Sequence, residues 1–293
     1  MSAETTVAVP VRTSRRTEVL GAFARPTAVV GLVLTAAVVL LALAGLLGLT
    51  PYDPARQDVI SSLQGPSGAH WFGTDQFGRD IFSRVASGLA NSLRIAIVSV
   101  GAAGLVGILL GVLAGYYGGL LDRVVGVITN VLFAFPSLLL ALALAATLER
   151  SWVTVSLAIG AVYMPIFARV ARGPVLTLRS VEYVTASTAI GRSRLSTLFA
   201  HVVPNMRGIL VVQVTLSLSW SILTEAALSF LGFGTPPPAA SLGGMVFDAQ
   251  TLSTIAPWML AFPGAALVVF VVGLNLVGDS LRAALDPRSR GGR

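Results

Sequence analysis

The chain has 293 residues, of which 55% are hydrophobic and only 11% are charged. A soluble globular domain carries about 25% charged residues, so this composition excludes an ordinary soluble domain. The chain contains no cysteine, which excludes disulfide bonds and thiolate metal sites.

Charge-poor stretches recur along the chain at the length needed to cross a bilayer. A membrane-spanning helix needs about 20 consecutive apolar residues to cross roughly 30 Å of hydrocarbon. We therefore expect an all-α integral membrane protein with six transmembrane helices within residues 28–278. The expected spans cover about 28–48, 96–118, 126–147, 153–171, 209–231 and 257–277. The remaining segments are an N-terminal segment 1–27, an outer loop 50–93, a loop 172–207 and a tail 279–293.

The arginines indicate the orientation of the chain in the membrane. All 20 basic residues are arginine. If the N-terminus is cytoplasmic, only five of them lie outside the cell membrane: Arg56, Arg79, Arg84, Arg94 and Arg150. The positive-inside rule therefore predicts that both termini and the loop 172–207 are cytoplasmic. Because this topology explains the net charge of +7, we expect no nucleic-acid binding.

The start of the chain resembles a signal peptide, because arginines precede an apolar run. The run is longer than the roughly 7–15 residues of a removable apolar region. We expect an uncleaved first helix.

Two patterns around the second expected span concern packing. Apolar residues spaced by four, from Ile81 to Leu93, predict an amphipathic helix that leads into this span. Within the span, glycines recur every three or four residues: Gly101, Gly104, Gly107, Gly111 and Gly115. Small residues on one stripe let helices approach closely in lipid. The alternative is that these glycines have no packing role.

The sequence lacks the residues that most membrane enzymes need. It has no lysine, so it cannot carry a Walker A loop, whose lysine contacts the terminal phosphates of ATP. Its two histidines, His70 and His201, are expected on opposite sides of the membrane, so they cannot share a metal or a catalytic triad. We expect no catalytic residue, no metal site and no cofactor in this chain.

Glu225 is the one ionisable residue well inside an expected span. Such residues are functional candidates, because a charge in hydrocarbon needs a partner, water or a proton. In a proton-coupled secondary transporter or channel subunit, Glu225 would carry the proton. The alternative is a structural glutamate that is hydrogen-bonded to a neighbouring helix near the outer interface.

The expected cytoplasmic loop contains an amphipathic helix. Leu195, Leu198, Phe199 and Val202 have the spacing of one helical face, with Gly191 before the helix and Pro204 expected to end it. Arg192 and Arg194 lie at its start, where the helix dipole favours acidic residues. A helix of this kind either docks in a groove of another protein or lies on lipid headgroups.

This loop resembles the cytoplasmic loop of bacterial ABC importer permeases, whose pattern is E-A-A, three residues, glycine, a helix and a proline. Here Thr185-Ala186-Ser187 stands for the triplet, Gly191 for the glycine and Pro204-Asn205 for the end. Threonine replaces the glutamate of the pattern at position 185. This departure puts in doubt any salt bridge that the family makes from that position.

Further strings resemble one subfamily, the C-type permease subunits of dipeptide, oligopeptide and nickel importers. They are GTDQFGRD at 73–80, AFPS at 134–137, EAALSFLG at 225–232, APW at 256–258, NLVGD at 275–279 and LDPR at 285–288. The resemblance covers residues 50–290 in the same order, and the strings together are specific.

The resemblance implies a type I ABC importer transmembrane domain in the bacterial cytoplasmic membrane, embedded in lipid as a multi-pass protein. It implies pairing with a B-type permease subunit as a heterodimer and an extracytoplasmic binding protein that delivers the solute. Two ATPase subunits, or one fused ATPase, would bind ATP and magnesium. The helix Arg192–Val203 would be the coupling helix. Its expected contact set is Thr185, Ala186, Gly191, Arg192, Arg194, Leu195, Leu198, Phe199, His201 and Pro204.

The resemblance further implies that Asp75, Gly78, Arg79 and Asp80 face the binding protein or the sister subunit. The alternative is a glycine turn followed by an aspartate that caps a helix. The solute expected from the subfamily is a peptide. Dipeptides, oligopeptides, nickel chelates, glutathione and haem all remain open.

Overall fold

The computed structural model describes residues 26–285. The expectations for residues 1–25 and 286–293, which include most of the expected N-terminal segment and part of the tail, lie outside the described residues. The long helices are α2 (Pro26–Leu46), α3 (Ile81–Tyr117), α4 (Gly119–Ala134), α6 (Trp152–Leu178), α9 (Val203–Phe230) and α11 (Trp258–Leu285). The shorter ones are η1 (Val59–Ser61), α5 (Ser137–Ala146), α7 (Glu182–Ala189), α8 (Arg194–Thr197), η2 (Leu198–Val202), α10 (Leu242–Ala249) and η3 (Gln250–Leu252).

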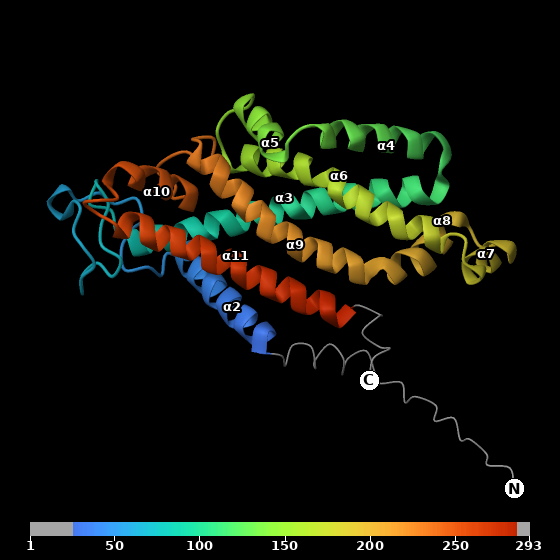
Figure 1. The fold of residues 1–293 in the computed structure, drawn as a ribbon, viewed down its shortest axis with the longest axis horizontal. Coiled ribbons are helices and arrows are strands. Elements are labelled where there is room, and N and C mark those ends of the chain that lie inside the picture. Colours follow the sequence, from blue (N-terminus) through green and yellow to red (C-terminus); the bar gives the residue numbers. More distant parts are fainter. Residues whose placement is uncertain (1–25, 286–293) are drawn as a thin grey trace, which may run out of the picture.

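The expected all-α fold class is confirmed for the described part of the chain, where one isolated bridge between Thr74 and Asp80 is the sole β-pairing. The long helices form an elongated bundle (Figure 1). The loop 47–80 and α10 lie at one end, called here the loop end, and α7 and α8 lie at the other, the α7–α8 end. α2 packs along α11, and α4 and α5 lie beside α6.

Five single helices are long and apolar enough to cross a membrane, and the pair α4–α5 adds a sixth if it forms one span. The expected third span, about 126–147, covers most of α4 together with α5, and these two helices meet at an angle of 92°. The break lies at Phe135-Pro136, where Phe135 is extended (φ −93°, ψ 140°). Proline disfavours the helical conformation of the residue before it and lacks a backbone N–H, so the helix ends there.

α3 is a single helix of 37 residues, about 55 Å long at 1.5 Å per residue. The expected amphipathic helix and the expected second span are therefore one continuous element. It exceeds the roughly 30 Å of a bilayer core, so α3 extends beyond the hydrocarbon. The polar residues of its first turns, including Arg84 and Asn91, lie at the loop end.

The glycine stripe packs α3 against α6. A Cβ at Gly107 or Gly111 would collide with the backbone of Met164 or Ala168, and Gly104 lies beside Phe167. Gly115 lies against Arg172 and Val175. Gly101 faces open space, so it does not belong to the packed stripe. The close approach that the sequence predicts is therefore confirmed for Gly107, Gly111 and Gly115, whereas a Cβ at Gly104 would make only an ordinary contact with Phe167 at 3.7 Å.

This contact gives a stability prediction. Gly111→Ala should lower the free energy of unfolding by about 1–3 kcal/mol, because the added methyl group meets the Ala168 carbonyl and the backbones must separate. Gly101→Ala is the matched control. It should be neutral or slightly stabilising, because alanine is the better helix former in open space. Thermal unfolding of the purified protein in detergent measures both, and equal unfolding temperatures would contradict the packing role.

Candidate functional site

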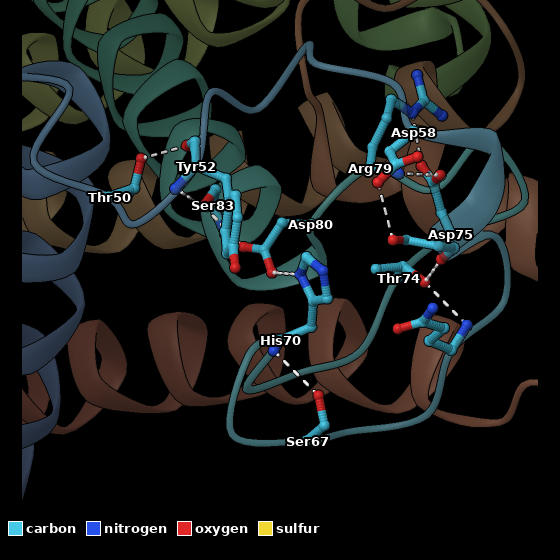
Figure 2. A network of polar contacts seen from close by, with 12 residues as sticks. Thr50, Tyr52, Asp58, Ser67, His70, Thr74, Asp75, Arg79, Asp80 and Ser83 are labelled. Carbon is cyan, nitrogen blue, oxygen red and sulfur yellow. Dashed lines mark hydrogen bonds and ion pairs between the residues drawn. The ribbon is translucent and has the colours of Figure 1, made fainter.

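The loop end contains a buried polar network that orders residues 47–80 (Figure 2). One Asp75 carboxylate oxygen accepts the backbone N–H groups of Phe77 (2.9 Å) and Arg79 (3.0 Å). The other oxygen accepts the Arg79 Nε–H at 2.6 Å. Gly78 has a φ of +70°, a conformation that glycine adopts without strain. The tight turn at 75–79 therefore depends on Asp75 and Gly78 together.

Asp80 caps the N-terminus of α3. Its Oδ2 accepts hydrogen bonds from the backbone N–H (2.8 Å) and the hydroxyl (2.7 Å) of Ser83. Its Oδ1 lies 2.9 Å from His70 Nδ1, and the His70 ring stacks on Tyr52 with the centroids 4.6 Å apart (Figure 2). This cap satisfies N–H groups of the first turn that have no partner within the helix.

The structure brings the four expected outer contact residues together, and Asp75, Arg79 and Asp80 are buried. Their charged atoms bind one another and the neighbouring backbone. The alternative of a glycine turn and a capping aspartate is confirmed as geometry. The expected contact with a binding protein or sister subunit stays a prediction.

Three residues that the sequence did not single out attach this network to the bundle. The Arg84 guanidinium lies 3.6 Å from Asp75 and donates to the Pro54 carbonyl at 3.1 Å. The Trp258 indole at the start of α11 donates to the Thr74 carbonyl at 3.1 Å. Burial raises the pKa of Asp248 on α10, and the charges of Arg79 and Arg84 oppose that rise. Of these three residues, only Trp258 could have been found from the sequence, through the APW string at 256–258.

Glu225 on α9 is fully buried between helices. Its two carboxylate oxygens accept the hydroxyls of Ser92 on α3 (2.6 Å) and Ser229 on α9 (2.7 Å). Ser92 lies in the part of α3 nearer the loop end, two residues before Arg94. The central carbon of the Arg94 guanidinium lies 4.2 Å from the centroid of the Trp152 ring. Glu225 therefore lies toward the loop end and joins α3 to α9. This geometry favours the structural reading of Glu225.

At the α7–α8 end, Gly191 forms the turn after α7 with a φ of +87°. The Ser193 hydroxyl then caps α8 by accepting the Ser196 N–H at 3.2 Å. The expectation that Pro204 ends this helix is wrong, because residues 194–230 form one helical run. The π turn η2 comes just before Pro204 and widens the helix where the proline ring would meet the preceding carbonyl.

The expected apolar face of this helix divides into two parts. Leu198 and Val202 are buried against Val112, Val175 and Met206. Leu195 and Phe199 are 52% and 50% exposed. Eight of the ten expected coupling residues are exposed: Thr185, Ala186, Gly191, Arg192, Arg194, Leu195, Phe199 and Pro204. His201 is half-buried, and its Nε2 accepts a hydrogen bond from the Arg192 guanidinium at 3.0 Å, so it lies within this segment.

A basic groove of about 760 Å³ opens beside this segment. Its lining includes Arg179, Thr185, Thr188, Arg192 and Arg194. The Thr185 hydroxyl donates to the Glu182 carbonyl of its own helix at 2.9 Å. Threonine at this position thus bonds within α7 and offers no charge to a partner. The groove is suited to an acidic or hydroxyl-bearing surface.

Within residues 26–285, no group of three histidine, aspartate, glutamate or cysteine residues is placed to hold a metal ion.

Comparisons with known proteins agree on one family. The model of the family "Binding-protein-dependent transport system inner membrane component" matches residues 107–291. The chain is 41% identical to the dipeptide transport system permease protein of Alkalihalophilus pseudofirmus, over 90% of this chain and 86% of that protein. It is also 41% identical to the glutathione transport system permease protein of Pectobacterium atrosepticum, over 82% of this chain and 80% of that protein.

A solved structure shares the fold. The MetNI methionine ABC transporter, in inward-facing conformations, superposes with a TM-score of 0.57 at 19% identity. The match covers 69% of this chain and 96% of the other. The fold is thus that of an ABC importer transmembrane subunit.

The helix cap at the loop end gives a testable prediction. Asp80→Ala should lower the free energy of unfolding by about 1–2 kcal/mol, because two α3 donors and His70 lose their acceptor. Asp53→Ala is the matched control, because Asp53 is exposed and accepts one turn N–H, from Ala55. Thermal unfolding in detergent compares the two, and an equal small effect would show that the cap does not order the loop end.

Proposed function

This chain belongs to the family of binding-protein-dependent transport system inner membrane components, and we propose that it is the C-type permease subunit of an ATP-driven peptide importer. Family membership places it in the inner membrane as a multi-pass protein. The dipeptide and glutathione permeases among its relatives support a peptide-like solute. The solutes of these relatives share an amide-linked amino-acid backbone and a free carboxylate.

The proposed assembly contains a B-type permease as a heterodimer partner, an extracytoplasmic binding protein and two ATPase subunits or one fused ATPase. ATP and magnesium would be bound by the ATPases. The loop end would be extracytoplasmic, and the α7–α8 end and both termini cytoplasmic. The permease domain would cover residues 28–278, with residues 172–207 as the coupling loop. The arginine-rich groove beside α7 supports this orientation, because cytoplasmic segments carry the excess of arginine.

The observation that carries the proposal is the exposed apolar surface at the α7–α8 end. Ile190 is 84% exposed, and Leu195 and Phe199 are half exposed. Exposed apolar residues rimmed by charges mark interaction sites. Residues 194–230 form one helical run of 37 residues, so α8 is continuous with a spanning helix. That course supports docking to a protein beyond the membrane and disfavours a helix lying in the headgroup plane.

The buried residues Leu198 and Val202 would transmit movement from the exposed segment to the spanning helices. Leu198 and Val202 pack against Val112 of α3 and Val175 of α6. The Arg179 guanidinium also donates to the Gly115 carbonyl at the end of α3 at 2.8 Å. A push on the exposed side of α8 would therefore move α3, α6 and α9 as a packed unit. This is the rigid coupling that an importer needs between its ATPases and its spans.

The docking surface is tested by a charge in its apolar part. Phe199→Asp should weaken ATPase docking by about 2 kcal/mol or more, roughly thirtyfold, because it removes a central aromatic contact and adds a charge. Co-purification of the ATPase subunits and ATP-driven peptide uptake measure this loss. Ile60→Asp is the control for ATPase docking, because Ile60 is an exposed apolar residue at the opposite end. ATPase retention by Phe199→Asp at the wild-type level would overturn the assignment.

Glu225 tests the alternative of a proton-coupled transporter. Glu225→Gln should keep at least about half of the uptake, because an amide can accept from one serine and donate to the other. Glu225→Ala should instead destabilise the protein by about 1–3 kcal/mol by leaving two buried hydroxyls without their acceptor. Uptake assays and thermal unfolding separate the two effects. Loss of uptake in a normally folded Glu225→Gln protein would favour a proton carrier.

A further inference from the structure

A groove of about 200 Å³ lies between α4 and α6. Its lining contains two arginines, two other polar side chains and small or apolar residues: Val125, Gly126, Thr129, Asn130, Ala168, Arg169 and Arg172. The two arginines differ in their partners. The Arg172 guanidinium donates to both oxygens of Asp122, at 2.5 and 2.8 Å. Arg169 has no acidic partner among residues 26–285.

The Arg169 guanidinium is held in place by neutral groups. It donates to the Asn130 side-chain carbonyl at 3.3 Å, and its central carbon lies 4.0 Å from the centroid of the Phe133 ring. Stacking on an aromatic face fixes the plane of a guanidinium and leaves its edge N–H groups free. Arg169 remains exposed on the surface of the chain. Its N–H donors are therefore held in a fixed orientation, and most of them have no acceptor among residues 26–285.

The proposed topology places the Arg169 guanidinium within the depth of the membrane. On α4, Phe133 follows Asp122 by eleven residues, which is roughly 16 Å of helix. Asp122 is paired with Arg172 at the α7–α8 end, so Phe133 lies well toward the middle of the bundle. Long basic side chains near a helix end normally extend outward to reach water. Arg169 extends inward, which requires water or a polar occupant in the groove.

A lipid phosphate does not fit this depth, because headgroups lie outside the hydrocarbon core. A carboxylate in an aqueous path does fit. The guanidinium fork matches a carboxylate with two parallel hydrogen bonds. Each peptide solute considered above has a free carboxylate that must cross the membrane. Resting on the proposed function, we propose that Arg169, oriented by Asn130 and Phe133, binds the solute carboxylate during passage.

The neutral partners of Arg169 suit a passing ligand. A conduction site must attract its ligand and then release it. The Asn130 carbonyl is a weak acceptor that a carboxylate displaces, and it takes back the guanidinium when the solute leaves. A fixed acid, such as Asp122 beside Arg172, would block this exchange. The contrast between two arginines one helical turn apart thus separates a structural ion pair from a solute-binding residue.

The test uses the complete importer in proteoliposomes. One peptide is supplied with a free C-terminal carboxylate and as its carboxamide, and ATP-driven uptake and ATP hydrolysis are measured. Arg169→Gln should lower uptake of the free acid about tenfold, the effect of losing a charged hydrogen bond, and change carboxamide uptake little. Arg169→Lys should restore part of the loss. Arg123→Gln, an exposed arginine on α4 outside the groove, should match the wild type.

Three results would overturn the assignment. Equal losses for acid and carboxamide would mean a structural role or an ion pair with the sister subunit. Loss of stimulated ATP hydrolysis together with uptake would place Arg169 in communication with the ATPases. A defect that disappears in vesicles without anionic lipid would identify a lipid phosphate as the ligand.

The natural absence of cysteine permits a second readout that does not depend on transport. Gly126→Cys adds a thiol to the groove at a position where a Cβ meets open space. A small water-soluble thiol reagent should label it, and the free peptide should slow labelling more than the carboxamide. Adding Arg169→Gln should remove that difference. No labelling would exclude an aqueous groove. If the wild-type complex showed no ATP-driven peptide uptake, the proposed function would fail, and labelling would still decide the carboxylate site.

Discussion

The close contact of α3 with α6 is the constraint on which the rest of the structure depends. Gly107, Gly111 and Gly115 lack the side chains that would separate the two backbones, so the helices touch closely over about two turns. In lipid, association relies on such contact, because hydrocarbon tails are as apolar as the side chains they would replace. α3 begins at the loop-end network and α6 leads into α7. The contact therefore connects the two ends of the molecule through one packed unit.

The polar residues of the loop end stabilise the ends of the packed helices and attach the loop to them. Asp75 and Asp80 bind donors of the loop and of the first turn of α3, and Trp258 attaches the same loop to α11. Glu225 joins α3 to α9 by two serine hydroxyls. Buried carboxylates are tolerated when donors satisfy them, and here each has its donors. These acidic residues thus organise helix ends and helix pairs, and the loop end offers a preformed surface.

The half of the bundle nearer the α7–α8 end differs from the loop end, because arginines lie beside a groove there. The break at Phe135-Pro136 ends α4, and a groove lies between α4 and α6 before that break. Arg172 closes one end of this groove by pairing with Asp122, whereas Arg169 faces along it toward Phe133. At the α7–α8 end, Leu198 and Val202 are buried, whereas Leu195 and Phe199 are exposed. A push on these exposed residues would reach the groove through α6, which gives a physical route from docking to solute release.

The sequence by itself determined the membrane class, the all-α fold and the glycine stripe, because these depend on hydropathy and on spacing along a helix. The motif strings indicated the family that the comparisons then identified. Local spacing also placed Gly191 before the helix of the cytoplasmic loop, and it offered a glycine turn with a capping aspartate at 75–80 as one of two alternatives, since both features depend on neighbouring residues.

Only the tertiary structure decided what each side chain faces. Spacing alone assigned Leu195, Leu198, Phe199 and Val202 to one face, but packing against α3 and α6 buried two of them and left two exposed. Helix-breaking propensity suggested an end at Pro204, but the π turn and the packing of α9 carried the helix through. Arg84, Asp248 and Arg169 acquired their surroundings from residues far away in the chain. Periodicity describes one helix at a time, whereas burial and charge pairing depend on the neighbours that the fold supplies.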